Sequence, residues 1–220
     1  MKIDFRYAVH PVDFKGYDTE RIRKEFLVEK IFEPDEIILV YSLYDRYIVG
    51  GAMPVTRSLS LESATELKAD YFLERREMGI INVGGEAVVD TADASYRLGF
   101  KEALYMGRET AGVAFRSVEA GKPAKLYINS APAHHKYPSA LITLKQAETA
   151  ILGSAETSNH RTLNKLLVNS VLPTCQLQMG MTELKPGSVW NTMPVHTHNR
   201  RMEAYFYFEV PEKQAVCHFM

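Results

Sequence analysis

Cysteine, tryptophan and unbalanced charge are scarce in this chain, and no apolar run is long. The two cysteines, Cys175 and Cys217, lie in apolar stretches where a buried free thiol is the default, so a disulfide scaffold is not indicated. A formal net charge of −1 gives no sequence-wide field that would attract nucleic acid or an anionic membrane. No run reaches membrane-spanning length, and the first residues lack the apolar core of a signal peptide. We therefore expect a cytoplasmic globular protein.

The bulk composition is that of an ordinary soluble protein. Of the 220 residues, 46% are hydrophobic and 24% are charged. This length allows one large domain or two modest ones, each with a buried core. Residues 215–220 are apolar to the last position, which would leave strand-like backbone groups unpaired. We therefore expect this sequence to be part of a longer protein.

An internal repeat is the most informative pattern. Met53-Pro54-Val55 recurs as Met193-Pro194-Val195, and the same offset superposes Leu27-Val28 on Leu167-Val168. A single repeated tripeptide can arise by chance. Two matches at one offset favour duplication of a structural unit.

A further match pairs two arginines and a glutamate in each copy. Arg75-Arg76 precede Glu77, and Arg200-Arg201 precede Glu203. This match needs a different offset, which an insertion near residues 59–71 of the first copy would explain. The chain therefore has the organisation of two related units.

Short strands separated by frequent turns predict an all-β architecture. With the repeat, they predict two β-barrel domains that divide near residues 140–160. We expect residues 1–150 to form the first barrel, and residues 151–220 to begin a second barrel that is truncated in this sequence. The expected elements are strands at 37–41, 48–49 (ended by Gly50-Gly51), 80–89 (a hairpin around Gly84-Gly85), 175–184, 202–208 and 215–220, and one helix, Thr19–Phe26, capped by Asp18 or Thr19.

His196-Thr197-His198 places two imidazoles two residues apart. On a strand, positions i and i+2 face the same side roughly 7 Å apart, so both rings can converge on one ion. Pro194 suits a strand entry, and Glu203 can return its carboxylate to the same ion after a bend. Two histidines and a carboxylate make a site for Zn, Fe, Mn or Ni, with positions left open for water or substrate.

The alternative is an accidental His-x-His motif, with Glu203 paired to Arg200 or Arg201. The flanking pattern favours the metal site. Glu203, Tyr205 and Tyr207 share one face of the expected strand, and the opposite face is wholly apolar. A polar face of this kind is typical of the inside of a ligand-holding barrel.

Several longer motifs are more specific than the metal motif alone. They lie in residues 25–30 (EFLVEK), 71–77 (YFLERRE), 131–134 (APAH), 174–184 and 190–208. In these motifs the chain resembles the 5-keto-4-deoxyuronate isomerases, or 4-deoxy-L-threo-5-hexosulose-uronate ketol-isomerases. The resemblance extends from about residue 20 to residue 220.

The resemblance implies a bicupin, with two cupin-type (double-stranded β-helix) barrels and one Zn²⁺ per subunit in the second. Members of the family bind zinc through three histidines and a glutamate. His196, His198 and Glu203 match three of these ligands, and the fourth is expected beyond residue 220. His218 matches no ligand position, and its apolar neighbours are typical of a core residue. The family also implies a homo-oligomer, commonly a hexamer.

The implied reaction belongs to pectin and uronate catabolism. It interconverts 5-dehydro-4-deoxy-D-glucuronate and 3-deoxy-D-glycero-2,5-hexodiulosonate, an aldose–ketose isomerisation through an enediol. This chemistry needs a Lewis acid and a general acid or base. We take Tyr205 as the catalytic candidate, with a structural tyrosine as the alternative. Arg161 and Arg201 are candidates to bind the substrate carboxylate, because guanidinium meets carboxylate bidentately. A solvated arginine or a local ion pair is the alternative for each.

The first copy is predicted to lack a metal. Thr56 and Ser58 stand where His196 and His198 stand in the second copy. His134-His135 is interpreted as a loop feature with at most one functional histidine, because adjacent residues of an extended chain face opposite sides.

Two other functions stay open on the sequence alone. One is another metal-dependent cupin enzyme, a dioxygenase or a sugar epimerase. The other is a non-catalytic sugar-binding bicupin. In each case the expected partners are a small molecule and further copies of the chain, with no nucleic acid and no membrane.

Overall fold

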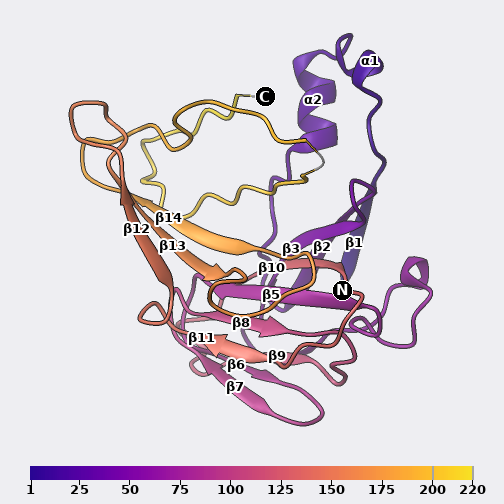
Figure 1. Ribbon diagram of the computed structural model, residues 1–220. Helices are drawn as coiled ribbons and strands as arrows, with labels where there is room; N and C mark the ends of the chain where they lie inside the picture. The colour runs from indigo at the N-terminus through magenta and orange to yellow at the C-terminus, as the bar shows by residue number, and fades with distance from the viewer. Residues whose placement is uncertain (200, 220) are drawn as a thin grey trace.

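The computed structural model describes residues 1–199 and 201–219, and β-strands make up most of its regular structure (Figure 1). Its elements in chain order are β1 (Lys2–Arg6), α1 (Pro11–Phe14), α2 (Thr19–Phe26), β2 (Glu36–Ser42), β3 (Tyr47–Met53), β4 (Leu59–Ser60), a 3₁₀ turn (Thr65–Leu67), β5 (Arg76–Asn82), β6 (Ala87–Asp90), β7 (Ser95–Leu98), β8 (Ala103–Met106), β9 (Ala114–Ser117), β10 (Leu126–Pro132), β11 (Ala140–Ile142), β12 (Glu148–Leu152), β13 (Arg161–Leu167) and β14 (Met179–Leu184).

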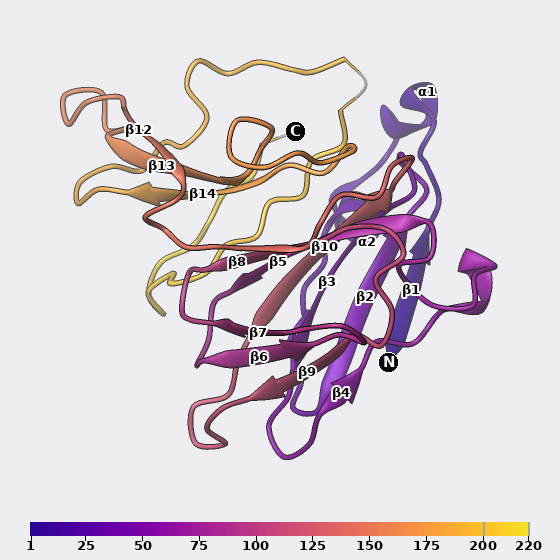
Figure 2. The ribbon, with the colours of Figure 1, turned by 60° about the horizontal axis from the view of Figure 1, so that its bottom comes forward.

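Two sheets facing one another form the N-terminal part of the molecule (Figure 2). One has seven strands in the order β1-β2-β3-β10-β5-β8-β11, and the other has four in the order β4-β9-β6-β7. Alternate residues of both sheets point into the space between them and form the larger hydrophobic core. Its fully buried members include Leu39, Ile48, Ile80 and Phe115.

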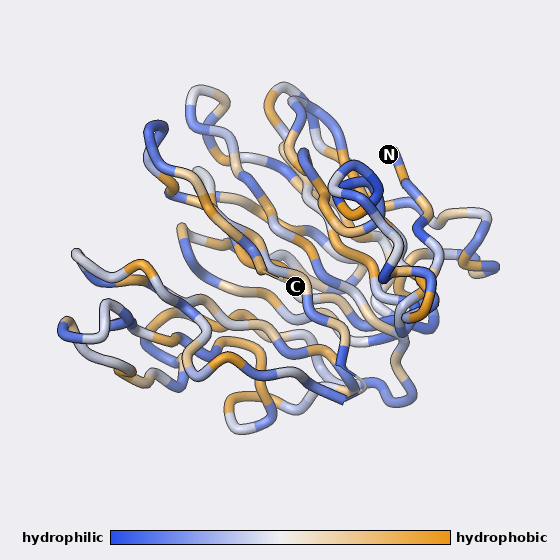
Figure 3. The backbone as a smooth tube through the Cα atoms, turned by 90° about the horizontal axis from the view of Figure 1, so that it is seen from above, coloured by the Kyte–Doolittle hydropathy of each residue, from blue (hydrophilic) through white to orange (hydrophobic). Residues whose placement is uncertain are grey.

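A third sheet, β12-β13-β14, covers the other face of the seven-stranded sheet. Leu166 and Leu167 of β13 pack with Met179 of β14 against Tyr105 and Tyr127 of the large sheet, in a second hydrophobic core. The chain passes from the seven-stranded sheet to the third sheet between Ile142 and Glu148. Figure 3 shows hydrophobic and hydrophilic residues alternating along the layered strands, and hydrophilic residues in several of the outer loops.

The predicted all-β class is confirmed. The two barrels are not confirmed, because all three sheets are open in the part of the chain that the structure describes, and the truncation of the second barrel stays a prediction. The division into domains stays a prediction. One matched pair of the repeat also falls in different surroundings, since Leu27 is the C-cap that follows α2 whereas Leu167 is the last residue of β13.

Gly50 and Gly51 do not end a strand as predicted, because β3 runs through both of them to Met53. A Cβ on Gly51 would lie 2.6 Å from a ring carbon of Phe32 and 2.8 Å from the Ile31 carbonyl oxygen. The glycines therefore allow close packing inside a strand and do not terminate it.

The predicted hairpin around Gly84-Gly85 is also wrong. β5 belongs to the seven-stranded sheet and β6 to the four-stranded sheet, so the glycines carry the chain from one layer to the other. The buried Asn82 side chain holds this connection, donating to the Gly85 carbonyl at 2.8 Å and accepting from the Gly84 N–H at 3.1 Å.

The predicted helix is confirmed as α2, with Asp18 as its N-cap accepting a hydrogen bond from the Arg21 N–H at 2.8 Å. Among residues 1–199 and 201–219, no helix combines the length and apolarity needed to cross a membrane.

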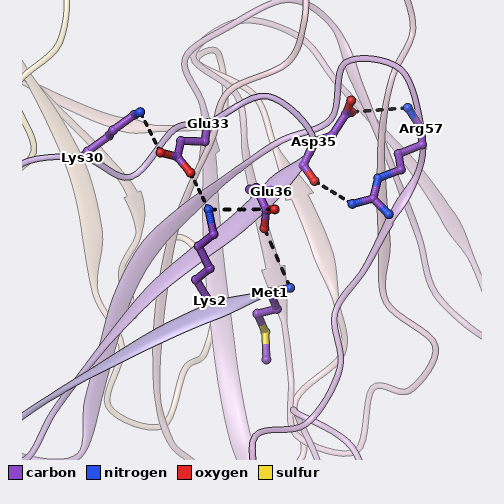
Figure 4. Close-up of polar contacts among 7 residues, drawn as sticks. All are labelled: Met1, Lys2, Lys30, Glu33, Asp35, Glu36 and Arg57. Atoms are coloured by element: carbon purple, nitrogen blue, oxygen red, sulfur yellow. Dashed lines mark hydrogen bonds and ion pairs between the residues drawn. The ribbon is translucent and has the colours of Figure 1, made fainter.

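Ion pairs lie at the edge of the seven-stranded sheet that is formed by the N-terminal strand β1 (Figure 4). β1 pairs in parallel with β2, and Lys2 and Lys30 each lie 2.7 Å from the Glu33 carboxylate. These bonds, Lys2 first, lower the pKa of Glu33 to about 2. Nearby, Asp35 accepts a hydrogen bond from the Thr56 hydroxyl at 2.6 Å and from the Val55 N–H at 2.8 Å.

Candidate functional site

Residues 201–208, which contain the glutamate of the metal motif, lie along the outer face of the seven-stranded sheet. The Phe206 ring stacks on Tyr127 of β10, with ring centroids 4.7 Å apart, and meets Phe32 edge-on at 5.8 Å. Phe206 and Phe208 are half-buried, whereas residues 203, 205 and 207 are exposed. The chain is not hydrogen-bonded as a strand here, but the predicted alternation of its two faces is present.

The three predicted metal ligands lie close together. The rings of His196 and His198 have centroids 4.8 Å apart, and His198 Nε2 is 3.5 Å from Glu203 Oε1. His196 Nδ1 lies 2.7 Å from the Pro194 carbonyl oxygen. In the tautomer that donates this bond, Nε2 is left free to bind a ligand.

This donor set fits a zinc ion in its chemistry. Two imidazole nitrogens and one carboxylate oxygen are among the ligands that zinc prefers, and they leave a position open for substrate or water. Within residues 1–199 and 201–219, no three His, Cys, Asp or Glu side chains stand in the arrangement of a ready-made metal site. His196, His198 and Glu203 are gathered pairwise, and their role as ligands stays a prediction.

Two further groups contact the Glu203 carboxylate. The Tyr205 hydroxyl donates to Oε2 at 3.1 Å, and Arg201 Nη1 lies 3.6 Å from Oε1. Burial raises the pKa of Tyr205 above its ordinary value. Arg201 therefore makes the ion pair considered in the sequence analysis, while Arg200 lies outside the described residues. The Arg201 side chain is 52% exposed, and its role in substrate binding stays a prediction.

Arg161 lies at the start of β13 and is 9% exposed. Its guanidinium donates to the Asn159 carbonyl at 2.9 Å and to the Met193 carbonyl at 3.5 Å. The second bond ties β13 to the segment that leads into His196. Arg161 therefore lies beside the metal motif, and part of its donor set is engaged by the backbone.

Sequence reasoning missed Glu77 as a structural residue. It is fully buried in β5 and accepts four hydrogen bonds between 2.6 and 2.8 Å. Three come from the backbone N–H groups of residues 175–177, and the fourth comes from the Tyr105 hydroxyl. These bonds explain why β14 begins at Met179 and not at Cys175 as predicted. The only available signal was an acidic residue inside an apolar strand.

In the first copy, Thr56 and Ser58 stand at the positions of His196 and His198, and both side chains have structural partners. The Thr56 hydroxyl and N–H both bond to Asp35, and the Ser58 hydroxyl donates to the Phe115 carbonyl at 3.3 Å. The Thr56 side chain therefore stabilises a turn, and the Ser58 side chain stabilises a strand edge.

Comparison with known proteins agrees with the family resemblance found in the sequence. The model of the KduI/IolB family matches residues 27–220. A protein of Bacteroides fragilis named 4-deoxy-L-threo-5-hexosulose-uronate ketol-isomerase is 62% identical over 217 residues, which cover 99% of this chain and 78% of that protein. A Formosa agariphila protein of the same name is 52% identical over all of this chain and 78% of its own length.

One solved structure, an IolB-like protein from Salmonella typhimurium, is similar to part of the chain. It is 20% identical with a TM-score of 0.47, over 58% of this chain and 47% of that one. A likeness of this extent adds nothing to the sequence matches.

Proposed function

This chain belongs to the KduI/IolB family, and on that premise we propose that it is an isomerase interconverting 5-dehydro-4-deoxy-D-glucuronate and 3-deoxy-D-glycero-2,5-hexodiulosonate in uronate catabolism. The observation that carries the proposal is the 62% identity, over nearly the whole chain, to a protein named as this ketol-isomerase. The prediction of an isomerase agrees with the names of the relatives.

The contacts among His198, Glu203 and Tyr205 support the proposal chemically. His196, His198 and Glu203 provide nitrogen and oxygen donors for one zinc ion, and Tyr205 holds the Glu203 carboxylate. A bound zinc ion supplies Lewis-acid polarisation of a carbonyl oxygen. The fourth ligand expected beyond residue 220, the hexameric assembly and the cytoplasmic location all stay predictions.

The chain's own residues bind and orient the substrate in this proposal. Arg201 attracts the substrate carboxylate, because its guanidinium is exposed and its present contact with Glu203 is a loose 3.6 Å. Arg161 is the second group that binds the substrate carboxylate, and its bond to the Met193 carbonyl places it beside the segment that carries both histidines. Tyr205 holds the Glu203 carboxylate through its hydroxyl.

Metal analysis and an isomerase assay test the proposal. Wild type is expected to hold about one zinc per chain and to turn over the deoxy-keto-uronate, and His196→Ala is expected to lose both. His10→Ala is the matched control, because His10 is an exposed histidine remote in sequence that caps α1. A metal-free, inactive wild type would overturn the assignment.

A further inference from the structure

His218 is exposed and hydrogen-bonded, in contrast to the buried core residue that its apolar neighbours predict. Its Nδ1 lies 2.8 Å from the Tyr207 hydroxyl oxygen. Its ring also meets Tyr205 edge-on, with centroids 5.1 Å apart. The segment before the end of the described chain therefore returns onto the row of residues 203–207.

This return completes a continuous line of polar groups. Glu203 accepts from Tyr205, the Tyr205 ring contacts His218, and His218 is bonded to Tyr207. The rings of Tyr205 and Tyr207 stack 6.4 Å apart at an angle of 17°, which keeps both phenols on one side. His218 is therefore linked to the Glu203 carboxylate through Tyr205.

We propose that His218, oriented by Tyr207, is the general base and acid that moves the proton in this isomerisation. The proposal rests on the proposed function, because it assigns a role within that reaction. It differs from the candidate Tyr205 of the sequence analysis, which in this arrangement holds Glu203.

The choice among the four groups follows from their chemistry. An imidazole can take a proton at one ring nitrogen while the other keeps its hydrogen bond, and it can return that proton. The Tyr205 hydroxyl is engaged with the Glu203 carboxylate, and the Tyr207 hydroxyl is engaged with His218. Glu203 is committed to a metal ligand's role in the proposed site.

The hydrogen bond to Tyr207 sets the orientation of the imidazole. When Nδ1–H donates to the Tyr207 oxygen, Nε2 carries the free lone pair and can act on the substrate. The same bond persists when the ring becomes imidazolium, because both nitrogens are then donors. Tyr207 is thus a positioning residue.

The proton transfers balance without any oxidant. Nε2 takes the proton from the carbon next to the aldehyde, and that C–H electron pair becomes the second carbon–carbon bond of the enediol as the aldehyde oxygen gains a proton. The imidazolium then returns a proton to the former aldehyde carbon, while the neighbouring hydroxyl loses its proton and becomes the ketone. Substrate and product are isomers.

His218→Asn tests the assignment in the intact protein. The asparagine amide can keep the bond to Tyr207 but cannot carry a proton, so kcat should fall roughly 10²- to 10⁴-fold. Zinc content and the denaturant midpoint should stay unchanged, and KM should stay within about threefold. In D₂O, wild type should exchange the substrate's carbon-bound hydrogen with solvent, and His218→Asn should not.

His10→Asn is the matched control. His10 is also exposed with its Nδ1 in a hydrogen bond, to the Val12 N–H at 3.2 Å, and asparagine can keep that helix cap. Activity partly restored to His218→Ala by added imidazole would support a proton-transfer role over a structural one. If wild type is active and His218→Asn keeps more than about a third of its kcat, the assignment of His218 fails while the proposed function stands. An inactive wild type overturns both this assignment and the proposed function.

Discussion

Glu77 and Glu203 each follow a pair of arginines in the two predicted copies, yet their surroundings are opposite. Glu77 is fully buried, and two hydrogen bonds of at most 2.8 Å saturate each of its oxygens. Glu203 has a side chain that is 36% exposed, and its contacts with His198, Arg201 and Tyr205 lie between 3.1 and 3.6 Å. One carboxylate joins two layers of the fold, and the other keeps capacity for a metal and a substrate.

The difference shows that the donors around a carboxylate decide its role. The partners of Glu77 are mostly backbone N–H groups, which cannot move away without breaking the fold. The partners of Glu203 are side chains near solvent, which can exchange for a ligand.

The largest stability effect is expected for Glu77→Gln. An amide would turn one NH₂ group toward N–H donors, and the free energy of unfolding should fall by about 3 kcal/mol in a denaturant titration. Tyr105→Phe, which removes one of the four donors, should cost about 1 to 2 kcal/mol. An unchanged midpoint for Glu77→Gln would contradict the structural role.

A smaller effect is expected where residues 201–208 rest on the large sheet. Phe206→Ala removes a half-buried ring stacked on Tyr127, and unfolding should become easier by about 2 kcal/mol. Zinc affinity should also fall, because the segment that carries Glu203 loses its support. Phe219→Ala is the control, since Phe219 is 80% exposed and should change stability by less than about 0.5 kcal/mol. Equal effects of the two substitutions would argue against this packing.

Arg161→Ala should act on substrate binding. KM for the uronate is expected to rise roughly tenfold with zinc content unchanged, as steady-state kinetics and metal analysis would show. If zinc is lost instead, the bond from Arg161 to Met193 serves mainly to hold the histidine segment. Unaltered kinetics would remove Arg161 from the site, and Arg201→Ala gives the comparison for an exposed arginine.

The smallest effect concerns Asp35 in the first copy. The Thr56 hydroxyl and neighbouring N–H groups lower the pKa of Asp35 to about 2 from an ordinary 3.8. Because the folded pKa is depressed, its stabilisation is present above pH 3.8 and is lost as the pH falls through about 2. An NMR titration should show this value, and Thr56→Val should raise it. A Thr56→Val protein with an unchanged Asp35 pKa would exclude the hydroxyl as the main cause.

Local signals were enough to predict part of the fold. The cap and amphipathic pattern located α2 to the residue, and the β-branched run located β2 to within a residue at each end. The alternation of residues 202–208 predicted which side chains share a face, but the polar face is exposed and does not line the inside of a barrel. Each of these features depends on neighbours in sequence.

What sequence reasoning missed depends on contacts between distant segments. Gly50 and Gly51 looked like strand breakers because the close approach of Ile31 and Phe32 is invisible in sequence. The backbone of residues 175–177 leaves the strand ladder because Glu77, about a hundred residues earlier, takes its N–H groups. His218 meets Tyr207 through a turn of the chain that no local pattern announced.

Glu203→Gln, measured beside Glu77→Gln, tests the contrast between the two carboxylates most directly. Glu203→Gln should lose zinc and isomerase turnover while its free energy of unfolding, with metal removed from both proteins, stays within about 0.5 kcal/mol of wild type. Glu203→Gln with full zinc content and full turnover would contradict the assignment of Glu203 to the site. A loss of stability equal to that of Glu77→Gln would show that both carboxylates are structural.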